Sequence, residues 1–235
     1  MIPLRDTVPA YRFPFVTILF IVVNVAVFFH EVKLGVHINE FIKIYGIVPQ
    51  HYFELTAQNR FNLFERFYPF LTSMFLHGGW MHLIGNMWFL WIFGDNVEDR
   101  LGHVRYLILY LIFGIVSGFA HTYINPHSSM PTVGASGAIA GVMGAYFIYF
   151  PRARILTLIP IFIFLQFIEI PAYFFLGIWF LFQFLSGAAQ FSMRSGSLGG
   201  IAWFAHIGGF LCGILTALIF YRNRSSAKYA QYSKN

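Results

Sequence analysis

Long apolar runs without a charged side chain are the feature that most constrains this fold. Six segments of about 17–25 residues, the length that crosses a bilayer, contain no Lys, Arg, Asp or Glu. They are Phe13–His30, Gly78–Gly94, Tyr106–Tyr123, Gly134–Phe150, Pro171–Ala189 and Gly200–Tyr221. Because 58% of the residues are hydrophobic and only 10% are charged, a water-soluble fold could not cover them. The sequence therefore predicts an all-α membrane protein with six transmembrane helices.

The placement of basic residues predicts the orientation of these spans. A seventh apolar run, Ile155–Ile168, is short and contains Pro160, which favours an interfacial or re-entrant segment over a span. With six spans and a cytoplasmic N-terminus, the cytoplasmic side holds Arg5, Arg12, Arg100, Arg105, Arg152, Arg154, Arg222, Arg224, Lys228 and Lys234. The outer side holds Lys33, Lys43, Arg60, Arg66 and Arg194. Because a seventh span would remove this bias, the positive-inside rule favours six spans with both termini inside.

The rest of the chain forms the ends and connections of one membrane domain. Residues 1–12 are expected to be a cytoplasmic N-terminal segment, 13–221 the six-span domain and 222–235 a cytoplasmic tail. The connection from Glu31 to about His77 mixes aromatic and charged residues, which predicts short amphipathic helices in the outer interface. The first span could also be a cleaved signal peptide, but no small-residue cleavage site follows it. We expect a multi-pass protein of the plasma membrane, since no transit peptide is visible.

Polar residues inside the spans are the candidate functional residues, because unpartnered polar groups are costly in a bilayer. Ser136 lies in Gly134-Ala135-Ser136-Gly137 at the start of the fourth span. Helix packing is one interpretation, since Gly137 and Gly141 have the GxxxG spacing. The other is a nucleophile, because flanking glycines let a substrate or partner group come close.

Two further spans carry groups that would complement a serine nucleophile. His206 is followed by Gly209 and Gly213, a small-residue face that lets another helix approach, and a neutral imidazole can accept a hydroxyl proton. His82 and Asn86 lie four residues apart on one helix face, where they serve either helix packing or stabilisation of an oxyanion. In the six-span topology all four residues fall in the outer half of the bilayer, and this shared depth meets the geometric requirement for acyl transfer.

Metal binding and disulfide formation are weaker interpretations of the polar residues. Cys212 is the one cysteine, so an internal disulfide is excluded. Histidines that could supply ligands are His77, His82, His121, His127 and His206. The sequence has no HExxH motif and no acidic residue within a span, so we expect no metal and no cofactor. The net charge is +6, but the charged residues lie between and after the apolar runs, which argues against nucleic acid as a partner.

Together these motifs closely resemble the rhomboid proteases over the whole region from Phe13 to Tyr221. The resemblance rests on Gly134-Ala135-Ser136-Gly137, on His82 and Asn86 behind Leu76-His77-Gly78-Gly79-Trp80, and on Ala205-His206 before Gly209 and Gly213. It implies a six-helix rhomboid bundle with an outer interfacial loop between the first two spans. It further implies a serine endopeptidase with a Ser136–His206 dyad, and an oxyanion held by His82, Asn86 and the Ser136 backbone N–H.

The same resemblance implies the partners and a gate. Substrates would be single-span membrane proteins cut in or near the outer part of their span, and the lipid bilayer would surround the enzyme. The fifth span, with Trp179, Phe180 and Phe182, would be the gate. Some relatives place a stacking Tyr under the base where this chain has Ala140, so His206 is either less firmly oriented or held by another aromatic residue. Some also carry a Trp-Arg pair where this chain reads Phe67-Tyr68-Pro69.

Two other functions remain open from the sequence. One is an inactive rhomboid-like protein that binds membrane clients, although such relatives typically lack the Ser or the His. The other is a small transporter or channel, for which ionisable groups at the midplane would be expected. The oligomeric state is not determined by the sequence.

Overall fold

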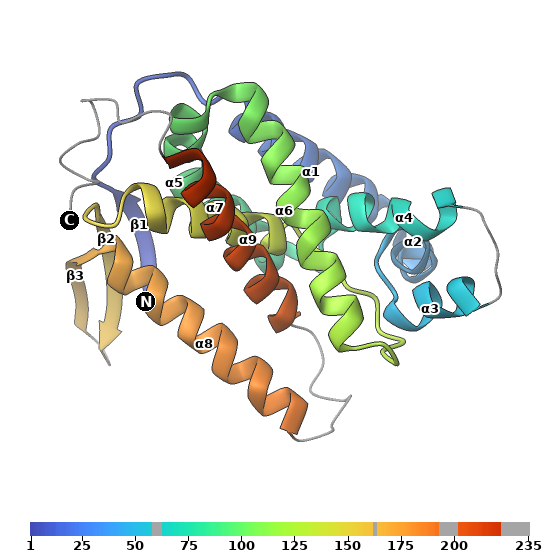
Figure 1. The fold of residues 1–235 in the computed structure, drawn as a ribbon. Coiled ribbons are helices and arrows are strands. Elements are labelled where there is room, and N and C mark those ends of the chain that lie inside the picture. The colour runs from blue at the N-terminus through green and yellow to red at the C-terminus, as the bar shows by residue number, and fades with distance from the viewer. Residues whose placement is uncertain (58–62, 162–163, 193–201, 222–235) are drawn as a thin grey trace.

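A computed structural model describes residues 1–57, 63–161, 164–192 and 202–221. Figure 1 shows a bundle of long helices with a small sheet at one end and several short helices at the other. The long helices are α1 (Phe15–Lys33), α5 (Trp80–Leu101), α6 (His103–Ile124), α7 (Ser136–Tyr149), α8 (Ala172–Ser192) and α9 (Trp203–Tyr221). A long helix thus lies at each of the six predicted spans.

The helices differ in their ability to cross a bilayer. Four of them, α1, α6, α8 and α9, are long and apolar enough to span it, which makes this a multi-pass membrane protein. The helix α7 has only 14 residues, or about 21 Å at the helical rise. The helix α5 is long but ends in a charged turn that contains Glu98 and Asp99. A mostly helical membrane protein is therefore confirmed, and the count of six spans stays a prediction.

The helix α7 lies at the centre of the bundle, packed against α5, α6 and α9. Its small side chains let these neighbours approach closely, and most of its residues are buried. A Cβ at Gly209 would overlap the carbonyl oxygen of Gly137, and one at Gly213 would overlap that of Gly141. The backbones of α7 and α9 are therefore in direct contact along these glycines.

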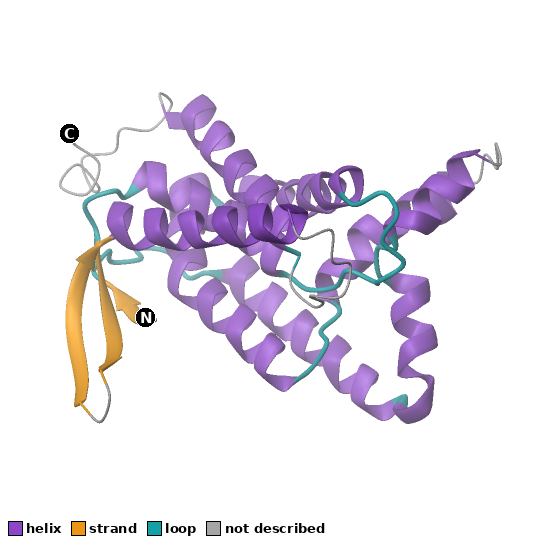
Figure 2. Ribbon diagram, turned by 90° about the horizontal axis from the view of Figure 1, so that it is seen from below, coloured by secondary structure: helices purple, strands orange, loops and turns teal. Residues whose placement is uncertain are grey.

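A three-stranded antiparallel sheet, which the sequence analysis did not predict, lies at the end of the bundle that holds the N-terminus (Figure 2). The strands β2 (Arg154–Ile161) and β3 (Phe164–Pro171) form a hairpin in the run predicted as an interfacial or re-entrant segment. The strand β1 (Ile2–Asp6) adds to its edge, with Ile2 opposite Leu158. β-Branched residues, Ile or Thr, occupy every second position along β2, a pattern that favours a strand.

A buried carboxylate joins α1 to α5 near the sheet. Glu98 is 1% exposed and accepts hydrogen bonds from the backbone N–H groups of Val16 and Thr17, at 2.9 and 2.8 Å. These are first-turn donors of α1 without a partner in the helix, and a negative charge there is favourable. His103 Nδ1 lies 2.6 Å from the same carboxylate. The position of α1 is thereby fixed against the end of α5.

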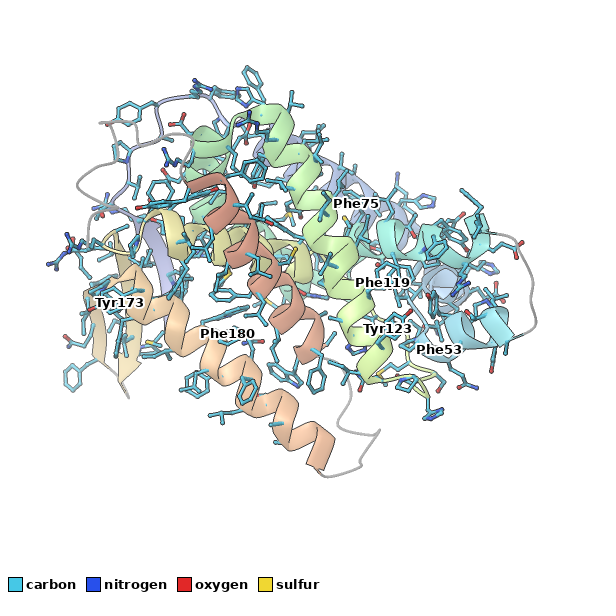
Figure 3. The ribbon with its side chains drawn as sticks, viewed as in Figure 1. Phe53, Phe75, Phe119, Tyr123, Tyr173 and Phe180 are labelled. Atoms are coloured by element: carbon cyan, nitrogen blue, oxygen red, sulfur yellow. The ribbon has the colours of Figure 1, made fainter. Side chains whose placement is uncertain are left out.

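The long connection between α1 and α5 folds into short helices, as predicted. They are η1 (Gly35–His37), α2 (Ile38–Tyr45), α3 (Pro49–Ala57), α4 (Leu63–Thr72) and η2 (Ser73–Phe75). Aromatic rings join α3 and α4 to α6. The ring centroid of Phe53 lies 5.7 Å from that of Tyr123 (Figure 3). Phe70 stacks on Phe119 at 4.1 Å between centroids. The location of these helices in the outer membrane interface stays a prediction.

Candidate active site

Ser136 is the first residue of α7, and a glycine with a positive φ, Gly134, places it close to α5. Gly134 has φ 126°, a conformation that L side chains rarely adopt. A Cβ at Gly134 would lie 2.7 Å from Nε2 of His82. The Gly134 N–H also donates to the carbonyl oxygen of Ser73 at 2.9 Å. A glycine is therefore required here for both the turn and the close approach to α5.

His206 lies in the first turn of α9, opposite the start of α7. Its Nε2 is 2.7 Å from Oγ of Ser136, a hydrogen-bond distance between residues 70 positions apart. The glycine contact between α7 and α9 explains this distance, because Gly137, directly after Ser136, meets Gly209, one turn after His206. The small-residue spacing and the polar residues, which the sequence left as alternative interpretations, thus belong to the same interface.

Gln183 of α8 contacts the other ring nitrogen of His206, an interaction that the sequence analysis missed. Its Oε1 lies 2.7 Å from Nδ1 of the imidazole. The signal that could have found it is an amide in the middle of the apolar run of α8. Trp179, one turn earlier, places its ring 6.0 Å from the imidazole at an angle of 36°. An aromatic residue therefore flanks His206 although Ala140 occupies the position of the stacking Tyr.

His82 and Asn86 lie on the first two turns of α5 and face Gly134. The backbone N–H of Gly78 donates to Nδ1 of His82 at 3.3 Å, which leaves the proton of a neutral ring on Nε2. Asn86 is 8% exposed, and its Nδ2 has no hydrogen-bond partner among the described residues. The Asn86 amide, without an acceptor among the described residues, and Nε2 of His82 thus lie beside the loop that leads into Ser136.

A cavity of about 1130 Å³ connects the helices that carry the candidate residues. Ser136, His206, His82 and Asn86 line it, together with His121 of α6, which the sequence analysis had considered only as a metal ligand. The described residues of its wall include no Asp, Glu, Lys or Arg. Within the described part of the chain, no group of three His, Cys, Asp or Glu side chains could hold a metal ion. The site is suited to proton transfer between neutral groups.

The chain matches the profile of the Rhomboid domain over residues 65–223. It belongs to the rhomboid family. It is similar to Rhomboid-like protein 11 of Arabidopsis thaliana, which is chloroplastic, with 34% identity over 39% of this chain and 34% of that protein. The mitochondrial Rhomboid protein 1 of Saccharomyces cerevisiae is 32% identical over 62% of this chain and 39% of its own length.

A third relative carries the word protease in its name. Rhomboid-like protease 5 of Toxoplasma gondii is 33% identical over 67% of this chain and 16% of its own length. The chain thus spans well under half of the rhomboid relatives it matches. Rhomboid membership follows from the domain match and a membrane location from the apolar helices, and the two organellar relatives lend no support to a plasma membrane.

Proposed function

We propose that this rhomboid chain is an intramembrane serine endopeptidase with Ser136 as nucleophile and His206 as general base. One observation carries the proposal: Ser136 Oγ lies 2.7 Å from His206 Nε2 at the wall of a cavity. A serine hydroxyl is a weak nucleophile at neutral pH and needs an adjacent base to take its proton. In this mechanism Ser136 attacks the peptide carbonyl, and His206 accepts the hydroxyl proton and returns it to the leaving amine.

The donors on α5 supply the oxyanion site of this mechanism. A tetrahedral intermediate carries negative charge on the former carbonyl oxygen, and preorganised donors stabilise it. We assign this role to Nε2–H of His82, the Nδ2 amide of Asn86 and the backbone N–H of Ser136. Support comes from the unpartnered Asn86 amide and from the Gly78 N–H, which directs the His82 proton toward the cavity.

The proposed substrates are the transmembrane segments of other membrane proteins. The helix α7 is about 21 Å long, whereas the hydrocarbon core is about 30 Å thick. A helix this short, with its C-terminal end near one surface, starts about 9 Å below the other, so Ser136 would act within the bilayer. Helix-breaking residues in a substrate would expose its peptide bond. Cytoplasmic termini belong to the proposal, on the basis of the basic-residue distribution.

The proposal is tested by active-site labelling of the purified full chain. A fluorophosphonate should label Ser136, as read by mass spectrometry of the modified peptide, and labelling should disappear in Ser136→Ala and His206→Ala. Cleavage of a fluorescent single-span substrate should fall by several orders of magnitude in both variants, because dyad members act as a unit. Full cleavage by Ser136→Ala would refute the mechanism.

A further inference from the structure

The contact at Nδ1 of His206 supports a further inference, which rests on the proposed function and deepens it. We infer that Gln183 is a positioning residue for His206, which takes the place of the acidic third member of a Ser-His-Asp triad. Its Oε1 lies 2.7 Å from Nδ1, while Ser136 Oγ lies 2.7 Å from Nε2. The imidazole of α9 is thus held between a hydroxyl on α7 and an amide on α8.

The chemistry of the amide oxygen fixes the tautomer of the ring. An amide oxygen can only accept a hydrogen bond, so Nδ1 of His206 carries the proton of the neutral imidazole. The lone pair of Nε2 then faces Ser136 and can take its proton. A hydrophobic side chain at Gln183 would leave both tautomers accessible, and the one with the proton on Nε2 cannot act as a base toward Ser136.

The burial of Gln183 supports a specific role over a chance contact. Gln183 is 8% exposed, whereas its neighbours Phe182 and Phe184 are 60% and 52% exposed. A buried amide in an apolar helix is costly unless it has a hydrogen-bond partner, and His206 is that partner. Trp179 lies four residues earlier on the same face and packs beside the imidazole. The helix α8 therefore presents one polar and one aromatic group to His206.

The other helices around His206 offer no carboxylate for this role. The titratable side chains that share the cavity with it are His82 of α5, His121 of α6 and His127 of the segment between α6 and α7, and no acidic side chain lines the described wall. A neutral acceptor stabilises the imidazolium of the transition state less than a carboxylate would, but it fixes the ring and the tautomer equally well. We therefore expect Gln183 to act on the turnover step rather than on substrate binding.

The experiment compares three variants of the full chain in detergent. It measures the rate of Ser136 labelling by a fluorophosphonate, and cleavage of fluorescently labelled casein, from pH 5 to 9. Gln183→Leu should lower the labelling rate and kcat by about 10–100-fold, the effect of one charge-assisted hydrogen bond, with KM changed less than about twofold. The control Phe184→Leu, on the exposed face of α8 next to Gln183, should keep the labelling rate and kcat of the wild type.

Gln183→Glu tests the pH dependence of the reaction, which should not change if Gln183 had only a structural role. A carboxylate at this position favours the protonated imidazole, so the acid limb of the pH–rate profile should move to higher pH. This shift also carries the test if Gln183→Leu fails to fold. The inference is overturned if Gln183→Leu labels at the wild-type rate, or if the acid limb of Gln183→Glu stays where the wild type has it.

Failure of this inference can be told from failure of the proposed function. If the dyad itself were wrong, the wild type would not label at Ser136, or Ser136→Ala would still cleave casein. If only the role of Gln183 were wrong, the wild type would label at Ser136 and Gln183→Leu would label equally fast.

Discussion

The two helix interfaces that meet at His206 are built in opposite ways. Between α7 and α9 the backbones touch, because Gly209 and Gly213 leave no room for a side chain against Gly137 and Gly141. Between α8 and α9 the contact is made by large rings, with Phe180 stacked on Phe210 at 4.9 Å between centroids (Figure 3). The first interface holds the Ser136 contact of His206, and the second holds its Gln183 contact.

This difference indicates which helix can move without changing the distance between Ser136 and His206. A backbone contact has no rotatable bonds to absorb a change, so a shift of α9 against α7 would alter the distance between Ser136 and His206 directly. Aromatic side chains can slide and change rotamer, so α8 can move while α7 and α9 stay in register. Leu181, Phe182 and Leu185 are more than half exposed, so among the described residues one side of α8 has few protein contacts that would oppose such movement.

The broadest effect should come from filling the glycine contact, because both stability and activity should change. Gly213→Ala would place a Cβ against the carbonyl oxygen of Gly141, so the helices must separate. We expect unfolding to become easier by about 1–3 kcal/mol, as for overpacked cores, and cleavage to fall on the order of 100-fold because the dyad is displaced. Thermal unfolding in detergent and casein cleavage measure the two effects.

The matched control for this glycine lies in α8. No atom would lie within 4 Å of a Cβ at Gly177, so Gly177→Ala should keep activity within about twofold and gain up to ~1 kcal/mol from helix propensity. Equal losses in the two alanine variants would contradict the contrast between the interfaces.

At α5, whose side chains face the site without carrying the dyad, the effect should be confined to activity. Asn86→Ala removes one proposed oxyanion donor, so kcat should fall about 10²–10³-fold at most while the fold is kept. The rate of Ser136 labelling by a fluorophosphonate should fall as well, because its phosphoryl oxygen occupies the oxyanion site. Wild-type kcat in Asn86→Ala, with an intact melting temperature, would exclude the amide from this role.

Loosening the aromatic interface should change dynamics more than chemistry. Phe180→Ala removes the ring stacked on Phe210, so backbone hydrogen exchange in α8 should become faster while α7 and α9 keep their protection. Cleavage should change by less than about tenfold, because the Ser136–His206 contact lies in the other interface. Faster exchange in α7 as well would show that the two interfaces are not independent.

The smallest effect is expected far from the site, at the sheet end of the bundle. Burial raises the pKa of Asp6 to about 6, although hydrogen bonds from Tyr146 and Asn96 favour its charged form. The pKa of an aspartate in the unfolded chain is near 3.9. Between about pH 4 and 6, Asp6 therefore holds a proton in the folded protein that it has lost in the unfolded chain. The contribution of Asp6 to stability should therefore fall as pH rises through this window, on the order of 1 kcal/mol.

Asp6→Asn cannot take up that proton. Denaturation measured at pH 4 and pH 6.5 should show a smaller stability difference in Asp6→Asn than in the wild type. Parallel stability curves for the two proteins would contradict the predicted titration of Asp6.

The sequence was sufficient to predict the positions of the long helices and of four side chains around the cavity. Uncharged apolar runs mark membrane helices because lipid excludes charge, and α1, α5, α6, α7, α8 and α9 all lie where such runs occur. Ser136, His206, His82 and Asn86 were recognisable because polar groups are rare in these runs, and all four line one cavity. Their catalytic roles remain a proposal that labelling at Ser136 would decide.

Other features depended on pairings between distant segments, which a periodic pattern does not encode. The hairpin of β2 and β3 was not predicted, since a short apolar run has the same composition in a strand, an interfacial helix or a re-entrant segment. Its partner β1 comes from the N-terminal segment, more than 140 positions away.

By itself, the sequence determined that this chain is a helical membrane protein of the rhomboid type, because the solvent of each segment follows from its local composition. Only the tertiary structure decided that Gln183 approaches His206 and that Glu98 holds the start of α1. Those contacts join helices that are separate in the chain, and their distances follow from how closely the backbones pack rather than from any local preference.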